Sequence, residues 1–398
     1  MDVNRERLWN HLRVLCEEIG PRLTGTPAGK RAADYIAEHF RRCGAQVEVQ
    51  DFPCPSWEHE STELTLLGPD GPEPLPAFAQ TFTEACDLEA DIVGVGTLHE
   101  LDLGPDLEGK VLVLYGEAAG GLAATRNPTL LSAEERRPSA VIVISPSETV
   151  STKLIRDPFL RVPAAAVSQS VGLKLLENRG KGLRLRIRAR RYDSTGHNVS
   201  GLLSGEEQGR IVVAAHFDSA AESPGATDNA SGTAVVLELC EMFAAAGMRR
   251  LGIDFIAYDA EEYGRHAGHG GNLGSVEYVR QHPAELQETR AVVEADTVGT
   301  ATSPPRLRGA KGWPAERKED ILNVLRRFPR YIVADRPGTA GGAFNLPGVP
   351  ALAFVNSWES IPIHTAQDTI ELVSADELAF ATQVIAAVVQ HLTSGQGA

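Results

Sequence analysis

IVVAAHFDSAAESPGATDNASG, residues 211–232, is the stretch of the chain that decides the fold. Its first part, residues 211–215, is an apolar run that predicts a buried strand. His216 and Asp218 stand at the carboxyl end of that strand, and Asp228 follows a short loop, just before an expected helix. Because open α/β sheets bind their ligands at the carboxyl ends of strands, this unit predicts a functional site.

After residue 197 the chain alternates between strand-like and helix-like segments. Apolar runs bounded by turn residues predict the strands, and apolar positions at helical spacing predict the helices. The alternation predicts an α/β fold with a mixed, mostly parallel sheet that has helices on both faces. We expect strands at 211–215, 251–258, 290–295, 331–334 and 351–355, and helices at 229–246, 274–281, 315–328 and 375–392.

A different texture begins near Pro53, where proline and glycine become frequent and the strand-like segments become short. We interpret residues 75–190 as a β-rich domain inserted into a host domain that consists of residues 1–74 and 191–398. The first part of the host is expected to form helices over 4–19 and 30–43 and a strand over 46–52.

The composition restricts the classes of protein and partner. The chain has 398 residues, of which 42% are hydrophobic, and a formal net charge of −15 with a pI near 5.3. An acidic surface argues against nucleic acid and anionic membranes as partners, and it suits an enzyme acting on peptide or aminoacyl substrates. No run approaches the ~18 apolar residues that a membrane helix needs.

The five cysteines are scattered and form no CxxC pair. We therefore expect neither a disulfide framework nor a thiolate metal site. The N-terminus, MDVNRERLWNHL, carries charges where a secretion signal needs an apolar segment, so the cytoplasm is the expected location. The sequence leaves open whether the chain forms a homodimer.

Candidate metal ligands stand at or near the ends of four predicted strands. They are two histidines, three carboxylates and one spare carboxylate: His216, His364, Asp228, Glu262, Asp296 and Glu261. Imidazole nitrogen and carboxylate oxygen are ligands of zinc, and two metal ions ~3.5–4 Å apart suit the hydrolysis of acyl or phosphoryl compounds. Asp228 is the natural bridge between two ions because its loop lies between the other ligands.

Two further aspartates are expected to orient the histidines. Asp218 lies two residues after His216, and residues i and i+2 of an extended chain face the same way, so its carboxylate can accept a hydrogen bond from that ring. Asp368 can act in the same way on His364. Each feature alone has an ordinary structural explanation, for instance Asp228 as a helix N-cap. The coincidence of these groups at strand ends favours a site.

Five motifs together resemble one class of enzyme, the co-catalytic di-zinc exopeptidases of the bacterial leucyl-type aminopeptidase, aminopeptidase Y and plasma glutamate carboxypeptidase type. The resemblance covers about residues 1–70 and 192–392, and residues 75–190 resemble a protease-associated (PA) domain. IGPRLTGTPAG (19–29) is similar to the opening signature of the family. The five motifs are HFD (216–218), ATDNASG (226–232), EEYG (261–264), EAD (294–296) and HTAQDT (364–369).

The resemblance implies two Zn²⁺ ions per chain and a hydrolytic activity. Asp228 would bridge the ions, and Glu261 would be the general base. This base would take a proton from a metal-bridging water that attacks the terminal peptide bond, and would pass it to the leaving amine. The remaining ligands divide between the ions as two pairs: His216 with Asp296, and Glu262 with His364.

Two departures from the family pattern concern substrate recognition. The segment RHAGHGGNL, residues 265–273, follows EEYG without a counterpart in the family, and we interpret its histidines as loop residues. Residues 339–341 read Thr-Ala-Gly where the family often has Ser-Asp-His. Phe344 and Trp358 are candidate walls of a side-chain pocket.

An aminopeptidase is the favoured activity. A carboxypeptidase or dipeptidase is the nearest alternative, because cations that could bind a terminal carboxylate are present at Arg306, Arg308, Lys311 and Arg336. The full two-metal set argues against an acyltransferase of the glutaminyl-cyclase kind. The intact ligands argue against a receptor-like protein that has lost its metals.

Overall fold

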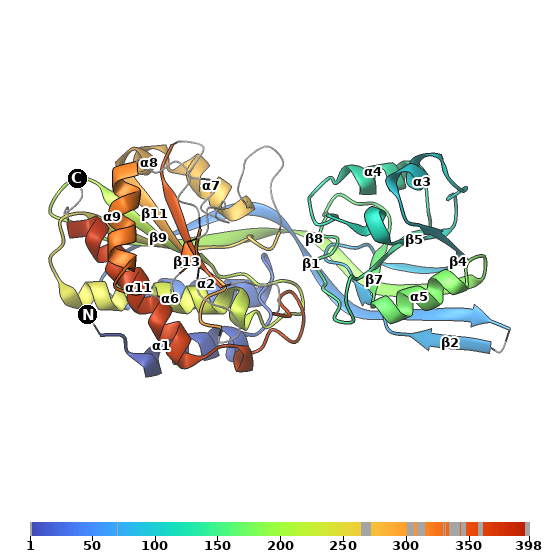
Figure 1. Ribbon diagram of the computed structural model, residues 1–398, viewed down its shortest axis with the longest axis horizontal. Helices are drawn as coiled ribbons and strands as arrows, with labels where there is room; N and C mark the ends of the chain where they lie inside the picture. Colours follow the sequence, from blue (N-terminus) through green and yellow to red (C-terminus); the bar gives the residue numbers. More distant parts are fainter. Residues whose placement is uncertain are drawn as a thin grey trace. The chain divides into compact units, whose positions relative to one another are not determined.

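The computed structural model describes residues 2–69, 71–263, 272–300, 306–308, 315–328, 330, 332–333, 343, 348–356 and 361–394 (Figure 1). The chain divides into two compact units: unit 1 is Met1–Cys54 with Thr195–Ala398, and unit 2 is Pro55–Ser194. The segment 75–190, which we expected to be an insert, lies within unit 2. Unit 2 begins earlier because the change of unit falls inside an uninterrupted strand, β1 (Gln46–Gly68).

The sheet of unit 1 has the strand order β13-β12-β14-β11-β9-β10-β8. Its central neighbours, from β14 to β10, are parallel, whereas β8 on β10 and β12 on β14 are antiparallel. The mixed, mostly parallel sheet predicted from the sequence is confirmed. The strands are β8 (Gly182–Leu203), β9 (Arg210–His216), β10 (Gly252–Tyr258), β11 (Thr289–Asp296), β12 (Arg306–Arg308), β13 (Ile332–Val333) and β14 (Ala351–Val355).

Helices cover both faces of this sheet, as predicted. Alternate residues of β9 face opposite sides, so Ile211 and Val213 pack into one core and Val212 and Ala214 into another, where Tyr278 of α7 packs. None of the helices in the described part of the chain is long and apolar enough to cross a membrane. The α-helices are α1 (Arg5–Arg13), α2 (Pro27–Arg42), α6 (Ser231–Ala246), α7 (Leu273–Gln281), α8 (Pro283–Glu288), α9 (Ala315–Leu325) and α11 (Ala375–Ser394).

Helix α2 shows how local sequence starts a helix here. Thr26 is its N-cap and accepts the backbone N–H of Gly29 at 3.2 Å, and Pro27 occupies the first turn, where a missing N–H costs nothing. Its apolar face is buried against the core that also contains α1, α6 and α11. That face comprises Ala32, Ala33, Ile36, Ala37 and Phe40.

Unit 2 is rich in β-structure and has a core of its own. Its strands follow the order β8-β4-β5-β6-β7-β3, in which β4 to β7 are parallel neighbours, and β1 pairs with β2. Its other strands are β2 (Gly71–Leu75), β3 (Phe78–Ala79), β4 (Cys86–Val95), β5 (Val111–Leu114), β6 (Ala140–Ile144) and β7 (Ala164–Val167). Its helices are α3 (Leu98–Leu103), α4 (Pro128–Glu135) and α5 (Gln169–Glu177).

Candidate metal centre

The order of the strands explains why the predicted ligands meet. His216 is the last residue of β9 and Asp296 the last of β11, and these strands are parallel neighbours. Glu262 follows β10, on the other side of β9, and His364 follows β14, next to β11. Asp228 comes from the short π-turn η3 (Ala226–Ala230), which leads into α6. Neighbouring parallel strands therefore deliver these groups to one edge of the sheet.

The carboxylate of Asp228 lies between the two histidines. Its Oδ1 is 3.1 Å from His216 Nε2, and its Oδ2 is 2.9 Å from His364 Nε2. Asp296 Oδ1 lies 3.7 Å from His216 Nε2, and Glu262 Oε1 lies 3.5 Å from His364 Nε2. The five side chains form two triplets that share Asp228, and within each triplet the candidate ligand atoms lie within 4.8 Å of one another.

The chemistry and charge of this cluster fit divalent cations. Burial would lower the pKa of His216, but hydrogen bonds to Asp218, Asp228 and Asp296 raise it well above its ordinary value. Burial would raise the pKa of Asp228, but the two histidines hold it well below its ordinary value. Buried charges need partners of opposite sign, and the triplets offer the nitrogen and oxygen ligands that zinc uses.

Asp218 contacts both loops of the centre. Its Oδ1 lies 3.3 Å from His216 Nδ1, and its backbone carbonyl lies 3.2 Å from the same nitrogen. The carboxylate also accepts the backbone N–H groups of Glu261 (3.0 Å) and Glu262 (2.8 Å). Asp218 was predicted to contact His216. It also fixes the backbone of the segment that carries Glu261 and Glu262, and the sequence did not predict these two hydrogen bonds.

Asp368 contacts the loop that carries Asp228. Its Oδ1 accepts the backbone N–H of Thr227 at 2.8 Å and the hydroxyl of Thr227 at 2.6 Å, and its Oδ2 accepts the backbone N–H of Asp228 at 3.1 Å. Burial raises the pKa of Asp368 to about 6. The sequence led us to expect that this carboxylate orients His364, four residues earlier. Its hydrogen bonds with Thr227 and Asp228 instead fix the backbone position of Asp228.

Arg22, within the opening signature, organises the loop after β9 and was not predicted to do so. Its side chain is fully buried. Its guanidinium donates to the backbone carbonyls of Phe217, Pro224 (2.6 Å) and Gly225 (2.9 Å), and its backbone N–H donates to Ser219 Oγ at 3.0 Å. Backbone acceptors leave no mark in a sequence, and the burial of Arg22 becomes visible only in the folded chain, so the sequence did not point to this role.

Asn229 ties the Asp228 loop to the end of β11. Its Oδ1 accepts the backbone N–H groups of Gly232 (2.9 Å) and Thr297 (3.1 Å), and its Nδ2 donates to the carbonyl of Ala295 at 3.0 Å. A Cβ on Gly232 would lie 2.3 Å from that same carbonyl oxygen, so only glycine permits this approach. The motif ATDNASG therefore fixes the position of Asp228 relative to the end of β11.

Glu261 is partly exposed, and in the sequence it directly precedes Glu262, which belongs to one of the triplets. Its Oε1 accepts a short hydrogen bond from Nδ2 of Asn272, the residue before α7. Phe344 and Trp358, the predicted pocket walls, and His266 and His269 of the extra segment lie outside the described residues.

The fold and the paired triplets define an α/β protein with a candidate two-metal centre of the hydrolase type. The sequence profile of peptidase family M28 matches residues 198–389, the region that carries every candidate ligand. The resemblance drawn from the motifs is thereby confirmed: this region is similar to peptidase family M28.

Relatives and solved structures extend the comparison. The chain is 27% identical to aminopeptidase YwaD of Bacillus subtilis over 96% of this chain and 83% of that protein. It is 23% identical to carboxypeptidase Q of Bos taurus over 73% of this chain and 65% of that protein. Its fold is similar to that of BSAP, a zinc aminopeptidase from Bacillus subtilis, with a TM-score of 0.81, 24% identity, and coverage of 100% and 97% of the two chains.

Proposed function

We propose that this chain is a zinc-dependent exopeptidase that releases the N-terminal residue of peptides. The observation that carries the proposal is the pair of triplets sharing Asp228, because one carboxylate facing two ligand sets is the arrangement that a two-ion site requires. The choice of an aminopeptidase rests on the similarity to aminopeptidase YwaD over nearly the whole chain.

Two Zn²⁺ ions per chain are the proposed cofactors. His216 and Asp296 would hold one ion, Glu262 and His364 the other, and Asp228 both. When bound, such ions polarise a carbonyl and lower the pKa of water. Asp218 acts as a positioning residue, since its carboxylate contacts His216 and the backbone of Glu261 and Glu262.

Glu261 is the proposed general base. Its carboxylate takes a proton from the water that attacks the scissile carbonyl carbon, and the C–N bond then breaks as the same proton passes to the leaving amine. The hydrogen bond from Asn272 holds Oε1 of Glu261 and so helps to orient the carboxylate.

The second candidate is a carboxypeptidase, which the similarity to carboxypeptidase Q favours. Aminoacyl 4-nitroanilides with a free amine, their N-acetyl counterparts and N-blocked dipeptides with a free carboxylate distinguish the two. We expect turnover of the free-amine substrates alone. Cleavage of the N-blocked dipeptides instead would replace the aminopeptidase by the carboxypeptidase.

We further propose that unit 2 is a protease-associated-like module that governs selectivity for peptide length. Its β-rich composition and separate core support this. Deletion of residues 55–194 should change the ratio of turnover on long and short peptides; an unchanged ratio in a folded enzyme would contradict the idea.

The location and partners that we propose rest on composition. The five free thiols support a reducing compartment, the cytoplasm, and the acidic charge disfavours nucleic acid as a partner.

A further inference from the structure

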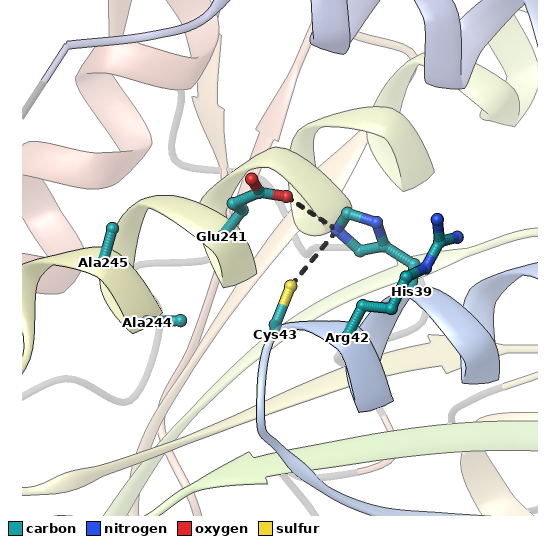
Figure 2. Close-up of a pocket in the computed structure, with 6 residues that line it drawn as sticks. All are labelled: His39, Arg42, Cys43, Glu241, Ala244 and Ala245. Carbon is teal, nitrogen blue, oxygen red and sulfur yellow. Dashed lines mark hydrogen bonds and ion pairs between the residues drawn. The ribbon is translucent and has the colours of Figure 1, made fainter.

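A second cluster of ligand-type side chains lies between α2 and α6, apart from the candidate metal centre. Figure 2 shows His39 and Cys43 of the α2 end together with Glu241 of α6 around a surface pocket. We propose that these three residues form a further metal site, which binds Zn²⁺ or a similar borderline divalent cation through His39 Nε2, Cys43 Sγ and Glu241 Oε2. Metal binding at this second site does not require the peptidase activity.

The spacing of the three atoms suits a tetrahedral ion. His39 and Cys43 are four residues apart and share one face of the helix end. His39 Nε2 lies 3.5 Å from Cys43 Sγ and 3.9 Å from Glu241 Oε2, and all three atoms lie within 4.8 Å of one another. Zinc bonds of ~2.3 Å to sulfur and ~2.0–2.1 Å to nitrogen at a tetrahedral angle place S and N about 3.5 Å apart.

The surroundings favour the ligand forms of the cysteine and the glutamate. Cys240 and His39 both make hydrogen bonds with Cys43, so polar groups that can stabilise a thiolate, the form that metals bind, lie beside its sulfur. Glu241 Oε1 accepts a hydrogen bond from Arg7 at 2.8 Å, which orients the carboxylate and leaves Oε2 on the side of His39.

Proton and charge balance at the site are consistent with a divalent cation. His39 Nε2 lies 3.0 Å from the carbonyl of Leu237, which accepts a hydrogen bond when that nitrogen carries the ring proton. Metal binding through Nε2 requires the ring to carry its proton on Nδ1 instead. One thiolate and one carboxylate cancel the two charges of the ion. Arg42, which lines the same pocket, therefore faces a neutral centre.

The ion also has a route to the site. The pocket has a volume of about 370 Å³ and is lined by His39, Arg42, Cys43, Glu241, Ala244 and Ala245. His39 is buried, whereas Cys43 and Glu241 are partly exposed.

Cobalt absorption tests the proposal on the full chain. The reduced, chelator-treated protein is titrated with Co²⁺ while its near-ultraviolet spectrum is recorded. A cobalt–thiolate bond gives a charge-transfer band there, whereas the nitrogen and oxygen ligands of the candidate metal centre give none, so the two sites are distinguished. We expect a band that saturates during the titration, with an amplitude that corresponds to one cobalt–thiolate bond per chain, and that disappears when Zn²⁺ is added in excess.

Variants assign the band to its residues. Cys43→Ser should abolish it with unchanged peptidase activity, and Glu241→Gln should weaken Co²⁺ binding roughly tenfold or more. Cys86→Ser is the matched control, because Cys86 is also partly buried but burial raises its pKa to about 11. If Cys43→Ser does not fold, protection of Cys43 from iodoacetamide by Zn²⁺ in the wild type gives the answer. Absence of the band and of that protection, or a band that survives Cys43→Ser, would overturn the proposal.

Discussion

The carboxylate of Asp218 accepts the backbone N–H of Glu262 through a hydrogen bond of 2.8 Å, which joins the loop after β9 to the loop after β10. The same carboxylate contacts the ring of His216 and the N–H of Glu261. One side chain therefore connects a proposed ligand of each metal ion and the proposed base. The negative charge of Asp218 acts on the ring of His216, and its two oxygens accept the backbone N–H groups of Glu261 and Glu262.

Replacing Asp218 should damage the metal centre without removing a ligand. In Asp218→Asn the oxygen still accepts a hydrogen bond but the NH2 group that replaces the other oxygen cannot, so one of the backbone contacts is lost together with the negative charge beside His216. We expect zinc affinity to fall about 10- to 100-fold, measured by competition with a chelator. Asp51→Asn is the matched control, because Asp51 also pairs with a histidine, His197, but on the surface. Equal zinc affinity in both variants would refute the positioning role.

The shared ligand should differ from the unshared ones in metal count. Asp228 belongs to both triplets, whereas Asp296 and Glu262 belong to one each. We therefore expect Asp296→Asn and Glu262→Gln each to retain about one tightly bound zinc at the candidate metal centre, and Asp228→Asn to retain neither. Elemental analysis after dialysis measures this, in a Cys43→Ser background so that the second cluster does not contribute. Loss of only one ion from Asp228→Asn would show that it does not bridge.

Glu261 should matter for turnover and not for metal binding. Glu261→Gln keeps the shape of the side chain and its contact with Asn272 but cannot take up a proton, so kcat should fall by about 10²–10⁴-fold. The zinc content of the same preparation should equal that of the wild type. An active Glu261→Gln enzyme with full zinc content would transfer the role of base to another group.

The ligands could be predicted because they lie in short motifs at strand ends, where parallel strands bring them together without further information. The role of Arg22 could not, because its partners are backbone carbonyls of residues 217, 224 and 225, which any residue provides. For Asp368 the near spacing to His364 suggested a local partner. Its strongest contacts are with Thr227, which only the folded chain brings near.

The second cluster was also hidden in the sequence, although half of it was visible. His39 and Cys43 have the spacing of neighbours on a helix, but a pair of such residues is common and carries little weight alone. Glu241 joins them only because α6 packs against α2 in the core. Because the cysteines are scattered in the sequence, we did not expect a metal site with a thiolate ligand. The tertiary packing of α6 on α2 places Glu241 beside His39 and Cys43.

Arg22 should be sensitive even to a conservative change. Arg22→Lys keeps the charge but has fewer donors in a different geometry, so buried carbonyls around Gly225 lose their partners. We expect a loss of about 3 kcal/mol in the free energy of unfolding, seen as a lower urea midpoint, and reduced turnover. Arg31→Lys is the control, because Arg31 is exposed and donates weakly to one carbonyl. Matching urea midpoints for the two variants would contradict this.

Asp254 on β10 should make stability fall as pH rises through the weakly acidic range. It is fully buried: its Oδ2 accepts the hydroxyl of Tyr278 at 3.0 Å and lies 3.7 Å from Arg210, while its Oδ1 has no hydrogen-bond partner among the described residues. Burial, only partly offset by Arg210 and Tyr278, raises its pKa from 3.8 to about 6. The folded state therefore holds this proton more tightly than the unfolded state does.

The sign of the effect follows from this difference. Stability from the protonated Asp254 is fully present below pH 3.8 and is lost as pH rises through about 6. Two pKa units correspond to about 3 kcal/mol. An asparagine side chain does not titrate, so in Asp254→Asn the free energy of unfolding relative to wild type should increase by about that amount between these pH values. Urea titrations of metal-free protein measure it, with Asp376→Asn, an exposed partner of Arg5, as the control expected to run parallel to wild type. Parallel curves for Asp254→Asn and wild type would mean that Asp254 does not take up a proton in this range.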